Sequence, residues 1–582
     1  MFLRKYKKEL YILASFGLIV FIFVFSNIYR QGIETFRSNI VSDELKEFGI
    51  YREVNIKSGG VQSTDEIYVK SWLDETVGIV YLFIPNVEFI EESKCWKYLC
   101  SGYQTVVVDG RNVSHGEDFV LRNGDYELVL DGRKEFLLRV IRSDNVSTLF
   151  LELEEGTLEG IRESKDNMAQ GRYLLTEPDK EIIEHSGIVR DIHARGNLSF
   201  TQTDKKSFSM KTEEEDELLG MNKSDTWLLI ANSFDSSLSR NYVASRMAEA
   251  LDVEYIVEAE YIDLYIDGEY QGNYQLSEKV EIADGRIEMR NLEEETEKIN
   301  LEEDLSRKRW NQEVNEQGYP IRKYVELEFE PSDNRNGYLL ELDMFHRYED
   351  EASGFLSERY QPIVIKSPEF ASENQVEYIA NKYQQLENAL CSINGYNEQE
   401  ELYYYDYLDT QSFAQKYLID EVTKNTDSSL SSFYICVPDE DGKFYAGPIW
   451  DYDKSLGANE VRDIYNLNDP IGLYASENIQ LDVTANREFS LYYLLCQQMD
   501  FQSVYKEFYT GGFRTAVLEI AAKDVMKNAE CLKDSAIMNA LRWNVYEGIT
   551  DVEKIERRYL RDNEWIRTFL QNRIEFLDEE WS

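Results

Sequence analysis

Several features that support common protein functions are missing from this sequence or scarce in it. The 582 residues include only four His and six Cys, and no Cys-x-x-Cys pair occurs, so a zinc site is not expected. No Gly-x-Gly-x-x-Gly loop is present, which disfavours a conventional protein kinase. Positive charge is scarce, with 62 Lys and Arg against 110 Asp and Glu, a net charge of −48. General nucleic-acid binding is therefore not expected, because phosphate backbones need local positive charge.

Cysteine offers one candidate disulfide. Cys95 and Cys100 are close enough in sequence to bridge outside the cell. Small buried thiols are expected for the rest, namely Cys391, Cys436, Cys496 and Cys531.

Only one apolar run is long enough to cross a membrane. Residues Tyr11 to Tyr29 carry no charge over 19 positions, enough for a hydrocarbon core about 30 Å thick. Four basic residues precede it and predict a cytoplasmic N-terminus: Arg4, Lys5, Lys7 and Lys8. A cleaved signal peptide is the alternative, but no small-x-small cleavage site follows. We therefore expect residues 1–30 to hold an uncleaved single-pass anchor in the cell membrane, with the bulk of the chain extracytoplasmic.

The length predicts two or more domains. After a polar stalk at residues 31–50, residues 51–158 alternate short β-rich runs with turns such as Asp131-Gly132. This pattern predicts a small all-β, sandwich-like domain for spacing or binding. Residues 159–582 are expected to form an α+β domain with a helical C-terminal part. Within it, the charged residues 291–332 are interpreted as a variable insertion, part helix and part loop.

Two acidic clusters of different character lie between residues 418 and 457. Asp427 sits in the polar turn NTDSSLSS, and Asp451 and Asp453 follow the apolar run GPIW. FYICV and FYAGPIW predict the two strands of a hairpin around DEDGK, which would bring the clusters together. One carboxylate can then orient an attacking hydroxyl while the others hold Mg²⁺ against phosphate oxygens. Surface turns in an acid-rich chain are the alternative interpretation.

A basic stretch stands out against this acidic background. Residues 187–211 contain only two Asp and five cations: Arg190, Arg195, Lys205, Lys206 and Lys211. Basic strands here could contact phosphates, although ordinary surface lysines give the same pattern. Alternation along the second strand places Phe208 and Met210 on one side and Lys211 on the other. His193 is interpreted as structural.

These motifs resemble a known family. GPIWDYDKSLG and DEVTKNTDSSLSSFY are similar to the signature segments of the CotH family, the spore-coat protein H kinases, and so are ARGN with KKSFSMK and the Arg-Asn pair at 240–241. The resemblance covers about residues 190–582. It implies a reduced, atypical protein-kinase-like fold that uses ATP with Mg²⁺ or Mn²⁺. The expected acceptors are hydroxyl residues of envelope or spore-coat proteins.

The resemblance also implies roles for the acidic residues. Asp427 would orient and deprotonate the acceptor hydroxyl. Asp451, with Asp453, would hold the metal ion. Ser432 stands where many members carry a metal-binding Asn; a hydroxyl binds Mg²⁺ more weakly, which puts a second metal ion in doubt.

The resemblance also implies a lysine that contacts the nucleotide, either Lys206 or Lys211. A glutamate, Glu278 or Glu249, would pair with it. The other candidate nucleotide and pocket residues are Arg195, Arg240, Glu341, Asp343 and Lys366.

Two other functions remain open. Ser432 favours a non-catalytic pseudokinase that acts as an envelope or spore-coat assembly scaffold. The sequence WDYD also fits the metal motif of a glycosyltransferase, which leaves the basic stretch and Asp427 unexplained.

Overall fold

The computed structural model describes residues 48–58, 61–86, 95–132, 134–178, 180, 182–301, 304–438, 441–458, 466–477 and 489–581. The predicted anchor, residues 1–30, and the stalk up to residue 47 lie outside the described residues. The last three positions of the predicted stalk belong to strand β1 (Phe48–Ser58). None of the helices in the described ranges is long and apolar enough to cross a membrane.

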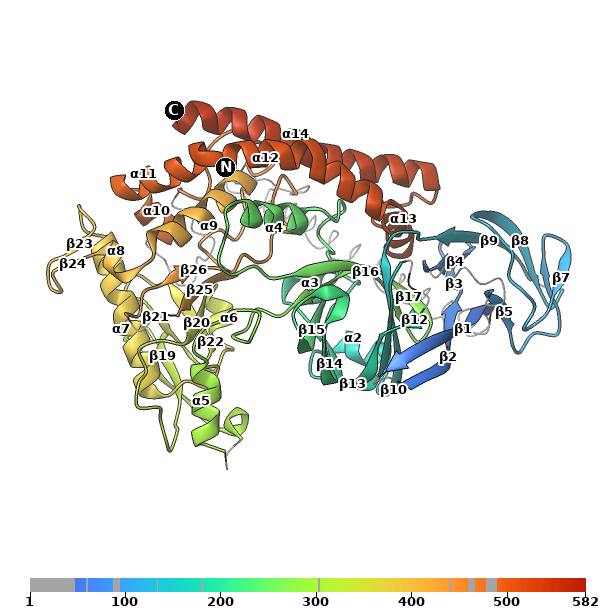
Figure 1. Ribbon diagram of the computed structural model, residues 1–582, viewed down its shortest axis with the longest axis horizontal. Helices are drawn as coiled ribbons and strands as arrows, with labels where there is room; N and C mark the ends of the chain where they lie inside the picture. The colour runs from blue at the N-terminus through green and yellow to red at the C-terminus, as the bar shows by residue number, and fades with distance from the viewer. Residues whose placement is uncertain are drawn as a thin grey trace, which may run out of the picture. The chain divides into compact units, whose positions relative to one another are not determined.

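The chain divides into two compact units. The first comprises residues up to 152 with 173–186 and 263–271; the second comprises residues 153–172, 187–262 and 272–582. The elements are mixed α and β, with long helices near the C-terminus (Figure 1). The α+β fold class is therefore confirmed at this level. The predicted domain boundary near residue 158 and the kinase-like arrangement stay predictions.

The first unit is rich in strands. β1 pairs with β2 (Val61–Lys70), β5 (Lys97–Cys100) and β12 (Ile182–Ile183). A second sheet has the order β3 (Trp72–Asp74), β4 (Ile79–Ile84), β9 (Lys134–Arg142), β8 (Gly124–Leu130), β6 (Val106–Val108), β7 (Arg111–Val113). The predicted hairpin at Asp131-Gly132 is confirmed, because Leu130 pairs with Lys134 across it and both turn residues have positive φ.

Seven strands close into a barrel, an arrangement that the sequence pattern did not predict. Their order is β10 (Ser147–Glu155), β11 (Ala169–Thr176), β13 (His185–Arg195), β14 (Ser207–Asp216), β15 (Ser224–Ile230), β17 (Glu269–Glu278), β16 (Ala259–Ile266). On β14, Phe208 and Met210 are buried while Lys211 is exposed, which confirms the predicted alternation. Two short helices lie between these strands in sequence, α2 (Leu158–Glu163) and α3 (Leu198–Gln202).

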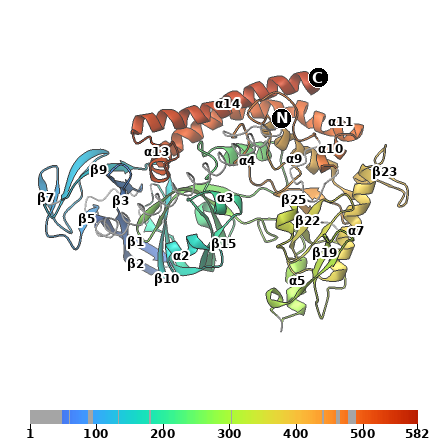
Figure 2. The same ribbon diagram turned by 180° about the vertical axis from the view of Figure 1, so that it is seen from behind.

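The second unit contains a further sheet of seven strands. Its order is β18 (Trp310–Val314), β19 (Pro320–Val325), β21 (Gly354–Leu356), β22 (Pro362–Ser367), β20 (Tyr338–Leu342), β25 (Phe433–Val437), β26 (Tyr445–Ala446). The predicted hairpin is confirmed by the pairing of Ile435 with Ala446. The segment 291–332 contains α5 (Leu292–Ile299) and also β18 and β19, so it is not only helix and loop. Helix α7 (Glu373–Leu390) runs along this sheet (Figure 2).

Helices dominate the C-terminal part, as predicted. They are α8 (Tyr404–Tyr407), α9 (Thr410–Thr423), α10 (Leu491–Leu495), α11 (Met499–Phe508), α12 (Arg514–Glu519), α13 (Val525–Trp543) and α14 (Val552–Trp581). The last two lie side by side (Figure 1). On α14, Ile566, Phe569, Leu570 and Ile574 are all buried and form an apolar stripe that packs into the core. Between α7 and α9 lie the paired strands β23 (Tyr396–Asn397) and β24 (Leu402–Tyr403).

A buried ion pair joins α14 to α9. The side chains of Arg573 and Glu421 are fully buried, with 2.5 Å between guanidinium and carboxylate. Arg573 also donates hydrogen bonds to the carbonyls of Pro470 and Gly472, at 2.7 and 2.6 Å. Glu421 accepts the backbone N–H of Tyr474 at 2.7 Å. The pair therefore fixes residues 470–474 against the two helices.

Loss of one partner of this pair should destabilise the protein strongly. Arg573→Met should lower the free energy of unfolding by about 3–5 kcal/mol, because Glu421 would remain buried without its cation. Arg567→Met removes the partly exposed partner of Glu564 and should cost about 1 kcal/mol or less. Urea denaturation followed by circular dichroism measures both. Equal losses for the two variants would contradict the expected cost of leaving the buried Glu421 without its cation.

Candidate active site

The candidate site is a cavity of about 500 Å³ within the second unit. This volume is typical of a small-molecule site. Its walls come from the end of β13, the loop after β15, strands β20 and β22, the turn after α9 and the segment after β26. Eight of the residues singled out from the sequence line it: Arg195, Glu341, Asp343, Lys366, Asp427, Ser432, Asp451 and Asp453. The hairpin thus brings both acidic clusters to one cavity.

The turn that carries Asp427 is fixed by hydrogen bonds to residues 466–474. Helix α9 ends at Lys424, which adopts a left-handed conformation with φ of 48°. The Lys424 ammonium donates hydrogen bonds to the carbonyls of Asn466, Asp469 and Ile471, at 2.7 to 2.9 Å. The hydroxyl of Tyr474 donates to the carbonyl of Thr426 at 2.8 Å. The position of Asp427 therefore depends on residues 466–474, which lie much later in the chain.

The loop that carries Asp451 and Asp453 is anchored through the residue between them. Tyr452 is buried, and its hydroxyl donates to Asp420, whose carboxylate also pairs with Lys416 at 3.1 Å. Asp451 has φ of 66°, which is uncommon for a residue other than Gly and is frequent at functional sites. The Ser432 hydroxyl lies 3.4 Å from the Asp451 carboxylate. This contact directly links the two acidic segments.

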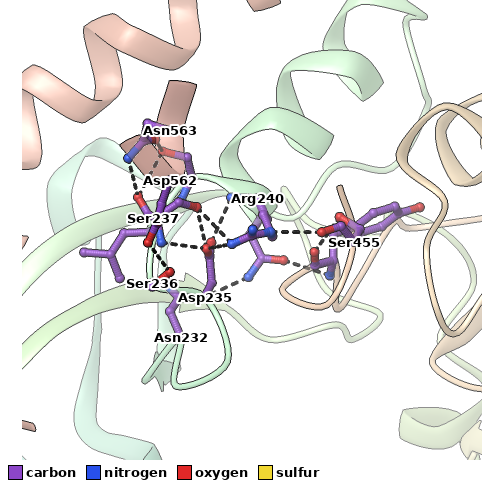
Figure 3. A network of polar contacts seen from close by, with 12 residues as sticks. Asn232, Asp235, Ser236, Ser237, Arg240, Ser455, Asp562 and Asn563 are labelled. Carbon is purple, nitrogen blue, oxygen red and sulfur yellow. Dashed lines mark hydrogen bonds and ion pairs between the residues drawn. The ribbon is translucent and has the colours of Figure 1, made fainter. Parts of the chain in front are cut away.

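The Arg-Asn pair at the start of α4 (Arg240–Ala250) holds the same loop. Figure 3 shows the Arg240 guanidinium between Asp235 and the carbonyl of Ser455, to which it donates at 2.9 Å. Asn241 accepts the backbone N–H of Tyr452 at 2.8 Å. Arg240 does not line the 500 Å³ cavity; its observed partners position the loop rather than a ligand.

Burial and mutual repulsion govern the protonation of the acidic clusters. Burial and the neighbouring Asp451 raise the pKa of Asp427 to about 7. The same two causes raise the pKa of Asp453 well above its usual range. A positive charge placed among these carboxylates would lower both pKa values. The cavity therefore favours a bound cation.

A second acidic wall lies on β20. Burial and the nearby Asp343 raise the pKa of Glu341 to about 8. Burial also raises the pKa of Asp343, which pairs with Arg347 at 3.2 Å. For Lys366, burial alone would lower the pKa, but Glu341 at 3.9 Å and Glu351 at 3.3 Å outweigh burial and raise it.

The two candidate lysines of the basic stretch lie outside the cavity lining. Lys211 is exposed and pairs with Asp225 at 3.3 Å. The Lys206 ammonium donates to the carbonyls of Phe200 and Thr203 and lies over the Phe200 ring. Their predicted contact with a nucleotide stays a prediction, and these positions do not favour it.

The two candidate glutamates have other partners than these lysines. Glu278 is buried and accepts the backbone N–H groups of Asn222 and Glu258, at 3.1 and 3.2 Å. Glu249 pairs with Arg246 one turn earlier on α4. Neither lines the cavity.

Three cations that line the cavity were missed by the sequence reasoning, and one of them, Lys454, directly follows Asp453. The other two come from elsewhere in the chain. Lys165 follows α2, and Arg347 lies in the short helix α6 (Phe345–Tyr348). Each stands alone in its local sequence, without a motif around it. His193 also lines the cavity and contacts Asp191 at 2.9 Å.

A second, larger cavity of about 1370 Å³ shares four lining residues with the first: Asn232, Ser233, Phe234 and Lys454. Thr426, the neighbour of Asp427, also lines it. Its outer wall carries the aromatic residues Trp543, Tyr546 and Trp565. Trp565 is 46% exposed. A larger partner could therefore approach Asp427 from this side.

The oxygen donors fit a divalent cation that arrives with phosphates. In the described ranges, no group of three or more His, Cys, Asp or Glu side chains is arranged to hold a metal ion. Mg²⁺ in phosphotransferases is held by one or two carboxylates together with substrate phosphates and water. Asp451, Asp453 and Ser432 provide hard oxygen donors of this kind, and burial together with the nearby charge of Asp451 raises the pKa of Asp453.

Comparison with known protein families gives a match that covers most of the chain. The sequence profile of the family described as "CotH kinase protein" matches residues 192–577. This segment includes every residue of the cavity lining except Lys165. No curated protein matches the chain closely enough to count as a relative.

Glu341 should make the stability of the ligand-free protein fall as pH rises. Its folded pKa is above the usual value, so the folded state binds the extra proton between about pH 4.5 and 8, and that stabilisation is lost through this window. Glu341→Gln should equal the wild type near pH 5 and exceed it at pH 8.5, by on the order of a few kcal/mol. Thermal unfolding across pH tests this, with the exposed Glu358→Gln as control. Parallel pH curves for wild type and Glu341→Gln would contradict the expectation.

Proposed function

Because the chain belongs to the CotH kinase family, we propose that it is a metal-dependent atypical protein kinase that transfers the γ-phosphate of ATP to a hydroxyl group. The observation that carries the proposal is the convergence of Asp427, Asp451 and Asp453 on one cavity. The proposed acceptors are envelope or spore-coat proteins. The proposed location, anchored in the cell membrane with the catalytic part outside, rests on the apolar residues 11–29 and their basic flank.

In this mechanism the carboxylate of Asp427 accepts the proton of the acceptor hydroxyl as the hydroxyl oxygen attacks the γ-phosphorus, and the bond between that phosphorus and the bridging oxygen breaks to release ADP. Without a ligand the pKa of Asp427 is about 7, and a cation bound beside it would lower this pKa, so the carboxylate would be ionised and able to accept a proton at neutral pH. The Ser432 hydroxyl beside Asp451 keeps the base and the metal ligands in one arrangement. Catalysis would come from positioning and charge neutralisation rather than from covalent chemistry.

Asp451 and Asp453, with Ser432, are the residues that would hold Mg²⁺ or Mn²⁺. The metal ion would neutralise the phosphate charge that this acidic chain otherwise repels. Arg195 supplies a protein cation on the same cavity wall. Arg240 and Asn241 act indirectly, because they bind the loop that presents the two aspartates.

The alternative function is a pseudokinase scaffold that binds nucleotide but transfers nothing. Ser432 favours it, because a serine hydroxyl is a weaker metal ligand than the amide oxygen of Asn. Transfer of labelled phosphate separates the two functions, whereas nucleotide binding does not.

The larger cavity is the proposed approach for the protein acceptor. It meets the first cavity at Lys454 and Phe234, next to the Asp427 turn. Its aromatic wall, with the half-exposed Trp565, resembles the anchor regions of protein interfaces, which are enriched in Trp, Tyr and Arg.

The two acidic clusters should fail in different ways when substituted. Asp451→Asn should abolish metal-dependent ATP affinity together with transfer, because the phosphates would face the acidic cavity without a bridging cation. Asp427→Asn should leave ATP affinity in the presence of Mn²⁺ nearly intact and slow transfer by roughly 10²–10⁴. Calorimetry with ATP and Mn²⁺, paired with a transfer assay, measures both. The exposed Asp144→Asn serves as a matched control. Equal loss of ATP affinity in both cavity variants would overturn the assignment of roles.

Trp565 should affect the acceptor and not the nucleotide. Trp565→Ala should raise the KM for a protein acceptor by about three- to tenfold and leave the KM for ATP unchanged, as expected for loss of one aromatic contact. Trp310 is similarly exposed, at 44% against 46%, but does not line either cavity. Trp310→Ala is therefore the control, and an equal effect of both variants would contradict the proposed approach.

A further inference from the structure

Three cations from separate parts of the chain line the 500 Å³ cavity together. Lys165 follows α2, Arg195 ends β13, and Arg347 lies in α6. In a chain of net charge −48, most cations are expected to pair with carboxylates, so three cations around one cavity point to a bound anion.

Arg195 pairs with no carboxylate in the described part of the chain. Within the described part of the chain its guanidinium makes no hydrogen bond and no ion pair; it lies 5.7 Å from the centre of the Trp450 ring. Burial lowers the pKa of Arg195, and the nearby Tyr434, Asp451 and Glu341 oppose this effect. A guanidinium has five N–H donors in a planar fork that matches phosphate oxygens. Those donors are available to a ligand in the cavity.

Arg347 is only partly satisfied. One terminal nitrogen donates to Asp343 at 3.2 Å, but its Nε is buried without a hydrogen-bond partner. A buried donor without a partner costs free energy, which an arriving acceptor would recover. The Arg347 charge also acts on the neighbouring Asp427, whose pKa it lowers against the larger effects of burial and Asp451.

Lys165 completes the group from the cavity rim. Its ammonium lies 3.0 Å from the side-chain oxygen of Asn197, a neutral acceptor, and 5.6 Å from the Phe200 ring. Burial lowers the pKa of Lys165, and so do the charges of Arg195 and Arg347. Both arginines therefore repel Lys165, and an anion bound among the three cations would relieve this repulsion.

We propose that Lys165, Arg195 and Arg347 form a subsite for the terminal groups of a polyphosphate chain, and that Lys165 supplies the lysine of this site from outside the segment that matches the family. Three cations from three segments suit an extended, multiply charged anion better than a single carboxylate. Arg195 is near Asp451 and Arg347 is near Asp427. A terminal phosphate held between them would lie between the proposed metal ligand and the proposed base. The assignment of this polyphosphate to ATP rests on the proposed function, whereas the anion subsite itself does not.

Inorganic tripolyphosphate is the direct probe, because it carries the anion without a nucleoside. Calorimetry on the full-length protein would compare tripolyphosphate, ATP and adenosine, each with Mn²⁺. Lys165→Met should weaken tripolyphosphate and ATP about tenfold and leave adenosine unchanged. Lys165→Arg should stay within about threefold of the wild type. Lys223→Met removes an equally exposed lysine that pairs with Glu215 away from the cavity and should change nothing. Because Lys165 is exposed, these variants should fold normally.

The outcomes separate this subsite from the kinase proposal. Tripolyphosphate binding that depends on Lys165, in a protein that transfers no phosphate, would support the subsite and contradict the kinase. Normal phosphate transfer with an unchanged KM for ATP in Lys165→Met would overturn the subsite and leave the kinase standing. Failure of the wild type to bind tripolyphosphate, or equal binding by wild type and Lys165→Met, would also overturn the subsite.

Discussion

Repulsion between carboxyl groups that share one cavity is the constraint on which the rest of the site depends. Asp427, Asp451 and Asp453 meet there, and the pKa values of Asp427 and Asp453 are raised by burial and by Asp451. Holding such groups together lowers the free energy of unfolding. A divalent cation bound with phosphates would relieve the repulsion between these carboxylates. The unfavourable arrangement is therefore what a cation-binding site requires.

The surrounding structure resists this repulsion with buried ion pairs placed behind the acidic loops. Lys416 and Asp420 fix Tyr452, and Arg240 with Asp235 fixes the following residues through Ser455. Arg573 and Glu421 do the same for the segment that supports the Asp427 turn. Buried charge pairs are weak sources of stability, but they define geometry sharply. Their shared function here is to hold the loops of the site in one arrangement around the cavity.

Local patterns in the sequence predicted the parts of the site that depend on neighbouring residues. The hairpin of β25 and β26, the convergence of Asp427 with Asp451, and the alternation around Lys211 all follow from short stretches. The closed barrel and the cation at Lys165 could not be predicted, because they depend on pairings between distant segments. Alternation placed Lys211 opposite Met210 but could not tell which side faces solvent. The domain boundaries and the roles of the site residues stay predictions.

The measurement that tests the central claim most directly is transfer of labelled γ-phosphate from ATP to a generic protein acceptor, with and without Mn²⁺ or Mg²⁺. If the gathered carboxylates exist to hold a metal–nucleotide complex beside a base, the wild type should transfer phosphate only with a divalent cation, and chelation should abolish transfer. Binding of ATP and Mn²⁺ without any transfer would contradict the catalytic account and favour the scaffold. Transfer that persists in the presence of a chelator would contradict the role given to Asp451 and Asp453.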